Sequence, residues 1–210
     1  MDRRPREDPD REEAANSLPP VPWSQNELHD RIAAGDPGVA AGTLAAMTAA
    51  SAAALVERVA RASVDEWSGA AGASAEALAL RRRAEALSAI NADAFSDAVA
   101  ALREPDPRVQ ELRNLALGAA LTRAAEVPLL IVEVCADTAV LAEQAARHAG
   151  PDERPDAVAA AELAAGAAWT AEHLVEVNLV TREGDDLRRP ARAAADRAAE
   201  AAARCRAAAH

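Results

Sequence analysis

The chain has 210 residues, half of them hydrophobic, and a formal net charge of −11. This length is typical of a single folded domain, and an acidic surface repels nucleic-acid phosphates and anionic lipids, so we expect neither as a partner. Aromatic residues make up 2% of the chain, whereas alanine is abundant, and this composition favours helices over strands. The expected fold class is all-α, a bundle of long alanine-rich helices.

The two ends of the chain differ from its middle. Residues 1–22 mix opposite charges with a proline run, so we expect a flexible segment there. They include no apolar leader, and no later stretch offers about 18 consecutive apolar residues, which predicts a cytoplasmic protein without membrane contact. The folded domain is expected over residues 23–185, followed by a C-terminal surface helix over residues 186–210 that frays.

Helix signals begin directly after the proline run. Ser24 and Glu27 have the spacing of a capping box, which predicts a short helix ending near Ala34. Residues 40–62 are nearly all small or apolar on every face. A helix of this kind must be buried on most sides, so we place it in the centre of a bundle or in a subunit interface.

The remaining helices are expected over residues 74–102, 107–148 and 156–180. Pro128 lies inside the second of these, and because proline lacks an N–H and displaces the carbonyl of Ala124, a kink or break is expected there. Asp156 is expected to be the N-cap of the last one.

Few residues carry obvious chemistry. The sequence contains no phosphate-binding loop, dinucleotide fingerprint or zinc-protease motif, and it has no lysine, which excludes Schiff-base chemistry. Two cysteines without a pattern, Cys135 and Cys205, predict no disulfide framework and no metal site. Polar residues do stand at unusual places in this alanine-rich chain: Gly42, Thr43, Asn91, Asp93, Asp156 and Asn178.

The order of these features resembles the cyclodeaminase/cyclohydrolase family, folate one-carbon enzymes related to the C-terminal domain of formiminotransferase-cyclodeaminase. Residues 36–60 resemble the family's TPGGGS turn and the buried alanine-rich helix after it. Residues 91–95 (NADAF) resemble its DxxAF segment, and residues 124–129 (AAEVPL) its AxxVPL segment. An Asp-initiated helix at residues 155–168 and the tripeptide Val177-Asn178-Leu179 complete the resemblance.

The resemblance implies an all-helical homodimer that binds a tetrahydrofolate derivative as substrate, with no tightly bound cofactor. The implied reaction is closure of formiminotetrahydrofolate with loss of ammonia, a lyase step, or hydrolysis of the methenyl bridge, a hydrolase step. The implied cleft lies between the turn at residues 36–43, the helix around Asn91, the Pro128 kink and the helix start at Asp156.

This sequence departs from the family where that chemistry is expected. Ala40 and Ala41 replace two glycines of the turn, and their methyl groups would narrow a cleft there. The family's aspartate falls on Asn91, which cannot titrate. Asp93, two positions on, points about 200° away around a helix.

We therefore expect an enzyme in which Asp156, Asn91 and Asp93 are the catalytic candidates. The candidates for substrate binding are Gly42, Thr43, Phe95, Asn178 and His173.

Each polar candidate also has a structural explanation. Asp156 would cap a helix, Thr43 would bond to the preceding turn, and Asn91 would bond to a neighbouring helix. Asn178 lies near a helix end, and His173 shares a helix face with Glu176. Two other functions stay open: a biosynthetic enzyme, such as a cyclase or carbon-nitrogen bond enzyme, acting on a non-folate substrate with the same fold, or a non-catalytic helical binding protein.

Overall fold

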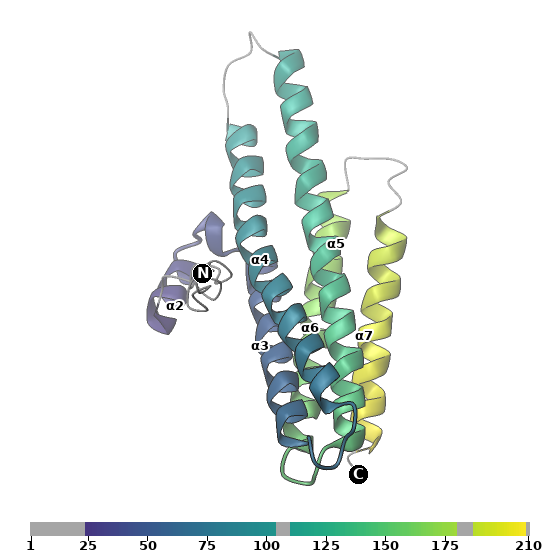
Figure 1. Cartoon of the computed structure of the whole chain (residues 1–210). Helices are drawn as coiled ribbons and strands as arrows, with labels where there is room; N and C mark the ends of the chain where they lie inside the picture. Colours follow the sequence, from purple (N-terminus) through teal and green to yellow (C-terminus); the bar gives the residue numbers. More distant parts are fainter. Residues whose placement is uncertain (1–23, 104–109, 180–186, 209–210) are drawn as a thin grey trace, which may run out of the picture.

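The computed structural model describes residues 24–103, 110–179 and 187–208. Within these ranges the chain is a helical bundle without strands, which confirms the all-α expectation (Figure 1). The expected flexible segment, residues 1–22, lies outside them. The elements are α2 (Gln25–Ala33), the 3-10 turn η1 (Pro37–Val39), α3 (Ala41–Ala62), α4 (Ala70–Arg103), α5 (Gln110–His148), α6 (Arg154–Asn178) and α7 (Arg188–Ala208).

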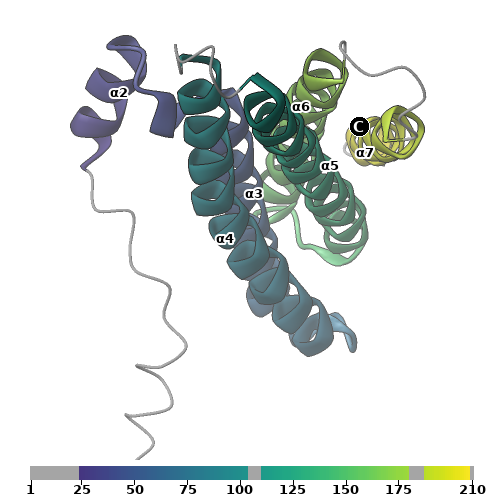
Figure 2. The ribbon, with the colours of Figure 1, turned by 90° about the horizontal axis from the view of Figure 1, so that it is seen from above.

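The bundle is organised around α5, which packs against α3, α4, α6 and α7. The helix α3 also packs against α4 and α6, and α7 covers α5 and α6. Seen from above, α7 and α2 lie on opposite sides of the molecule (Figure 2). Both α4 and α5 continue past the start of α3, so the pocket described below lies along their length and not at their tips (Figure 1).

Alanine makes up most of the core. It has the highest helix propensity, and its single methyl group lets neighbouring helix backbones approach closely. The clearest case is α7, whose seven buried residues are six alanines and Cys205. The C-terminal helix therefore packs against the bundle with one face buried.

Helix boundaries follow the local signals with two exceptions. The capping box of α2 is confirmed, because Glu27 N donates to Ser24 Oγ at 3.3 Å and Ser24 N donates to Glu27 Oε2 at 2.7 Å. The helix α5 runs through Pro128 without a break. However, α4 begins at Ala70 instead of residue 74, and α6 begins at Arg154, so Asp156 lies inside the first turn and is not the N-cap.

One stretch of the described residues, Pro37–Ala62, is long and apolar enough to cross a membrane by length and composition, with a mean hydropathy of 1.8. Of that window, 56% is buried inside the bundle. The expectation that no stretch is long and apolar enough to span a membrane is therefore wrong for Pro37–Ala62, although the core helix of a soluble protein passes the same test.

Candidate functional site

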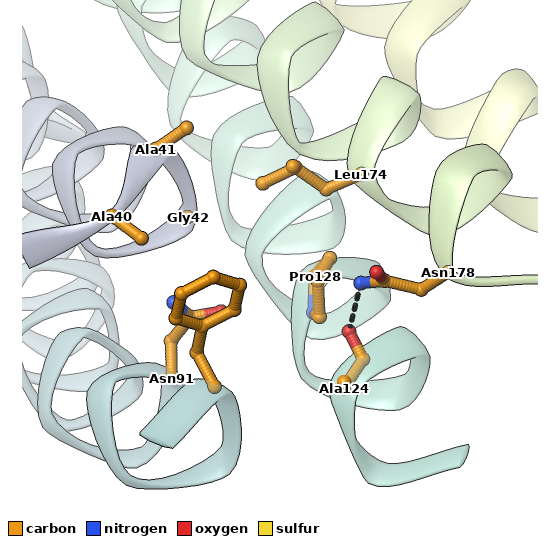
Figure 3. Close-up of a pocket in the computed structure, with 9 residues that line it drawn as sticks. Ala40, Ala41, Gly42, Asn91, Ala124, Pro128, Leu174 and Asn178 are labelled. Atoms are coloured by element: carbon orange, nitrogen blue, oxygen red, sulfur yellow. Dashed lines mark hydrogen bonds between the residues drawn. The ribbon is translucent and has the colours of Figure 1, made fainter. Parts of the chain in front are cut away.

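A small pocket lies where the start of α3 and the end of α6 meet the middle of α4 and α5 (Figure 3). Its cavity volume is about 40 Å³, enough for a few water molecules. The lining residues come from four helices and the turn before α3: Ala40, Ala41, Gly42, Asn91, Phe95, Ala124, Pro128, Leu174 and Asn178.

Asn91 joins α4 to the start of α3. Its side chain is 6% exposed, and a buried carboxamide is costly unless it is hydrogen-bonded. Asn91 Nδ2 donates to Thr43 Oγ1 at 3.3 Å, and Thr43 Oγ1 in turn donates to the Gly38 carbonyl at 3.4 Å. This chain of bonds fixes the amide against the turn that precedes α3.

Gly42 is the residue that lets Asn91 come so close. A Cβ atom at position 42 would lie 2.5 Å from Asn91 Oδ1 and 2.8 Å from Asn91 Cγ. Real Cβ atoms do not make such short contacts, so any larger residue would push the amide out of position. Gly42, a sequence-based candidate for substrate binding, is therefore in direct contact with the side chain of Asn91.

Asn178 joins α6 to α5 through a consequence of Pro128. Because proline has no N–H, the carbonyl of Ala124 lacks its partner one turn along the helix. Asn178 Nδ2 donates to this carbonyl at 2.6 Å (Figure 3). The long-range hydrogen bond satisfies the carbonyl and holds the wall of the pocket together.

The chemical character of the pocket is neutral. None of the described residues that line it carries an ionisable side chain, and its polar side chains are the two carboxamides. Carboxamides donate and accept hydrogen bonds at any ordinary pH but do not exchange protons. The arrangement is suited to orienting an uncharged polar ligand or a water molecule.

The structure brings four of the sequence-based candidates, Gly42, Asn91, Phe95 and Asn178, together at the pocket, with Thr43 buried directly behind it. Asp93 is exposed on a different face of α4, and the side chain of His173 is 71% exposed, 4.0 Å from Glu176. Neither lines the pocket.

The position of Asp156 differs from the sequence-based expectation that this residue borders the cleft. It lies 22 residues before Asn178 on α6, about 33 Å along a helix, and pairs with Arg58 near the far end of α3. The expectation that it borders the cleft is therefore wrong. Conversely, Leu174 was not expected, although it lies one turn before Asn178 and hence on the same face of α6.

Two comparisons bear on what this pocket belongs to. The sequence profile of the formiminotransferase-cyclodeaminase family matches residues 24–197. This chain belongs to the formiminotransferase-cyclodeaminase family. A solved structure, the formiminotetrahydrofolate cyclodeaminase of Thermotoga maritima, superposes with a TM-score of 0.78 at 20% sequence identity, over 89% of this chain and 96% of that one. None of the curated proteins matches the chain.

Most of the segments that resemble the family meet at this pocket. Of the five family-like segments, four contribute to the pocket: the turn before α3, residues 91–95, residues 124–129 and the end of α6. The fifth begins at the opposite end of α6. Within the described residues no group of three or more His, Cys, Asp and Glu side chains could hold a metal ion.

Proposed function

We propose that this member of the formiminotransferase-cyclodeaminase family binds a tetrahydrofolate derivative at the pocket and acts on its one-carbon unit, as a cytoplasmic homodimer. The observation that carries the proposal is the meeting of four family-like segments around two fixed carboxamides. A pterin ring presents alternating hydrogen-bond donors and acceptors, and carboxamides match both. The ring edge enters the small cavity, and the rest of the ligand lies outside it.

Between the two family reactions, the neutral lining favours hydrolysis of the methenyl bridge. In that reaction water adds to the methenyl carbon and loses one proton to solvent. The remaining hydroxyl proton then passes, through water, to the leaving nitrogen as one carbon-nitrogen bond breaks and the formyl carbonyl forms, so the added water itself supplies the proton that the leaving nitrogen needs. Loss of ammonia from the formimino compound needs an acid to protonate the leaving nitrogen, and no described lining residue supplies one. Asn91 is assigned the role of orienting the attacking water or the ring.

The test is to assay both reactions with the full chain. Faster loss of methenyltetrahydrofolate absorbance than in buffer, abolished by Asn91→Leu, would support the hydrolase assignment. Release of ammonia from formiminotetrahydrofolate would move the assignment to the cyclodeaminase reaction. If the protein shows neither activity, that result would contradict the proposal that it is an enzyme acting on folate.

A second candidate is a non-catalytic folate-binding protein, and the absence of ionisable side chains among the described lining residues favours it. Calorimetric titration distinguishes the two. Binding of 5-formyltetrahydrofolate without turnover of either substrate would establish this candidate, whereas no binding at all would leave an enzyme acting on a different substrate with the same fold.

A further inference from the structure

The pocket is too small to hold a whole ligand of the proposed kind. Its cavity volume of about 40 Å³ accepts a few water molecules or the edge of a ring. Most of a larger ligand must therefore lie on a surface next to the pocket. The helices that form the pocket also form such a surface.

A groove between α3 and α6 begins where the pocket ends. Ala41 lines both of them, and in Figure 3 it lies with Leu174 on the side of the pocket away from Asn91. On α6, Asn178 and Leu174 line the pocket and Thr170 lines the groove. These three positions are each one turn apart, so they share a face of the helix. The groove is therefore a direct continuation of the pocket along the same two helices.

The groove is apolar and much larger than the pocket, with a volume of about 410 Å³. It runs over residues 41–48 of α3 and 162–170 of α6, about 10 to 12 Å. Its lining is mainly alanine, leucine and glycine, and Leu163 is 42% exposed. Glu162, the one ionisable residue in the described lining, is paired with Arg206. An apolar lining with a few polar groups is typical of small-molecule sites.

Two threonines add hydrogen-bond acceptors to this apolar lining. Thr48 Oγ1 donates to the Leu44 carbonyl at 2.8 Å, and Thr170 Oγ1 donates to the Gly166 carbonyl at 3.0 Å. Each hydroxyl therefore uses its only proton within its own helix, and its oxygen keeps lone pairs for a donor on a ligand. The groove suits an apolar group that carries an N–H.

We propose that the groove holds the aromatic arm of the ligand whose ring edge enters the pocket. The inference rests on the proposed function, because the arm of a tetrahydrofolate is a benzene ring between an amine nitrogen and an amide N–H. The benzene ring lies against the alanines and Gly166, and the amide N–H donates to a threonine hydroxyl. The terminal carboxylates of the arm extend into solvent, since none of the described lining residues is cationic.

A side chain added at Gly166 tests the position of the arm. Gly166 lines the groove, and a Cβ atom there meets nothing within 4 Å. Gly166→Leu in the full chain therefore fills the groove without a clash in the bundle. Gly72→Leu is the matched control, because a Cβ at position 72 also meets nothing within 4 Å and the residue lies on α4, outside the groove. Both variants should keep the helical circular dichroism of the wild type.

Two ligands separate the arm from the ring. One is 5-formyltetrahydrofolate, measured by calorimetry, and the other is 5-formyl-6-methyltetrahydropterin, which has the ring without the arm and is measured by ligand-detected NMR. We expect the wild type to bind the folate at least about tenfold more tightly than the pterin. Gly166→Leu should weaken folate binding at least about tenfold and leave the pterin affinity within about twofold. Gly72→Leu should change neither affinity.

A wild type that binds both ligands equally, or a Gly166→Leu variant that binds the folate as tightly as the wild type, would overturn the groove assignment and leave the proposed function intact. Equal loss of both ligands in Gly166→Leu would also overturn it, because the substitution would then act on the ring. No binding of either ligand by the wild type would instead contradict the proposed function, and the groove assignment would fall with it.

Discussion

At the end of the bundle where α3 finishes and α6 starts, polar side chains are paired with opposite charges, whereas at the pocket end they are held by neutral hydrogen bonds. Arg58 pairs with Asp156 at the first end, and the buried Glu57 pairs with Arg61 and Arg81. At the pocket end, Asn91 bonds to a threonine hydroxyl and Asn178 to a backbone carbonyl.

The difference separates structural polar groups from groups able to bind a ligand. The carboxylates at the first end are already engaged by arginines, Glu57 by two of them, so less of their hydrogen-bonding capacity is left for a ligand. Each carboxamide bond at the pocket uses one N–H group and does not use the amide oxygen, and a carboxamide has two donors and an acceptor. Polar residues at the pocket end can therefore serve structure and binding together.

The largest effect is expected from Gly42→Ala, which attacks the pocket end. The added methyl group collides with the Asn91 amide, and such overpacking costs about 1–3 kcal/mol. Urea unfolding measures this loss. Gly72→Ala is the matched control, because a Cβ there meets nothing within 4 Å and alanine raises helix propensity by about 0.5–1 kcal/mol. If the two substitutions changed the unfolding free energy equally, the contact between Gly42 and Asn91 would not explain the need for glycine at position 42.

The next effect concerns the bond between α5 and α6. Asn178→Ala leaves the Ala124 carbonyl without its donor and should cost about 1–2 kcal/mol of unfolding free energy. In a Pro128→Ala background the backbone N–H returns to that carbonyl, so the same substitution should then cost less than about 0.5 kcal/mol. A double-mutant cycle by chemical denaturation measures the coupling. Additive effects would show that Asn178 does not replace the missing N–H.

The next smaller effect concerns the pKa of Glu143, an ion-paired residue near the end of α5. Hydrogen bonds from Arg204, at 3.0 and 3.1 Å, with Arg147 beside them, hold the pKa of the Glu143 carboxyl below its ordinary 4.5. The unfolded chain titrates near 4.5, so this stabilisation is complete above that pH and is lost as the pH falls through the lower folded value.

Glu143→Gln should therefore cost about 1 kcal/mol at pH 7, since the arginines are half exposed, and the difference from wild type should shrink below pH 4.5. Denaturation at a series of pH values checks this. Asp137→Asn, which breaks the exposed pair with Arg197 on the same two helices, is the control and should change little. A difference that persists at pH 3 would contradict the ion-pair explanation.

The smallest effect is expected at Asp156. Its pair with Arg58 is solvent-exposed, with side chains 36% and 60% exposed, and such pairs contribute about 0–1 kcal/mol. Asp156→Ala should lower stability by no more than that, measured by thermal unfolding. A larger loss would mean that Asp156 has a structural role beyond this pair.

Local signals predicted much of the fold. The capping box at Ser24, the alanine-rich helix after Gly42 and the carbonyl displaced by Pro128 all depend on residues within a few positions of one another. The sequence could not show that Asn178 reaches that carbonyl, because the two residues are 54 positions apart. It also could not show which end of α6 faces the pocket, and this is why Asp156 was misplaced. The position of α2 outside the bundle was also not predictable, because it depends on the turn after α2, where Gly35 has a φ of +72°.

The most direct test of the contrast between the two ends is calorimetric titration with 5-formyltetrahydrofolate of the wild type, Asn91→Ala and Asp156→Ala. We predict that Asn91→Ala weakens binding at least tenfold, about 1.4 kcal/mol, and that Asp156→Ala leaves the affinity within about twofold, less than ~0.5 kcal/mol. Equal loss in both variants, or an Asn91→Ala protein that binds as tightly as wild type, would contradict the account.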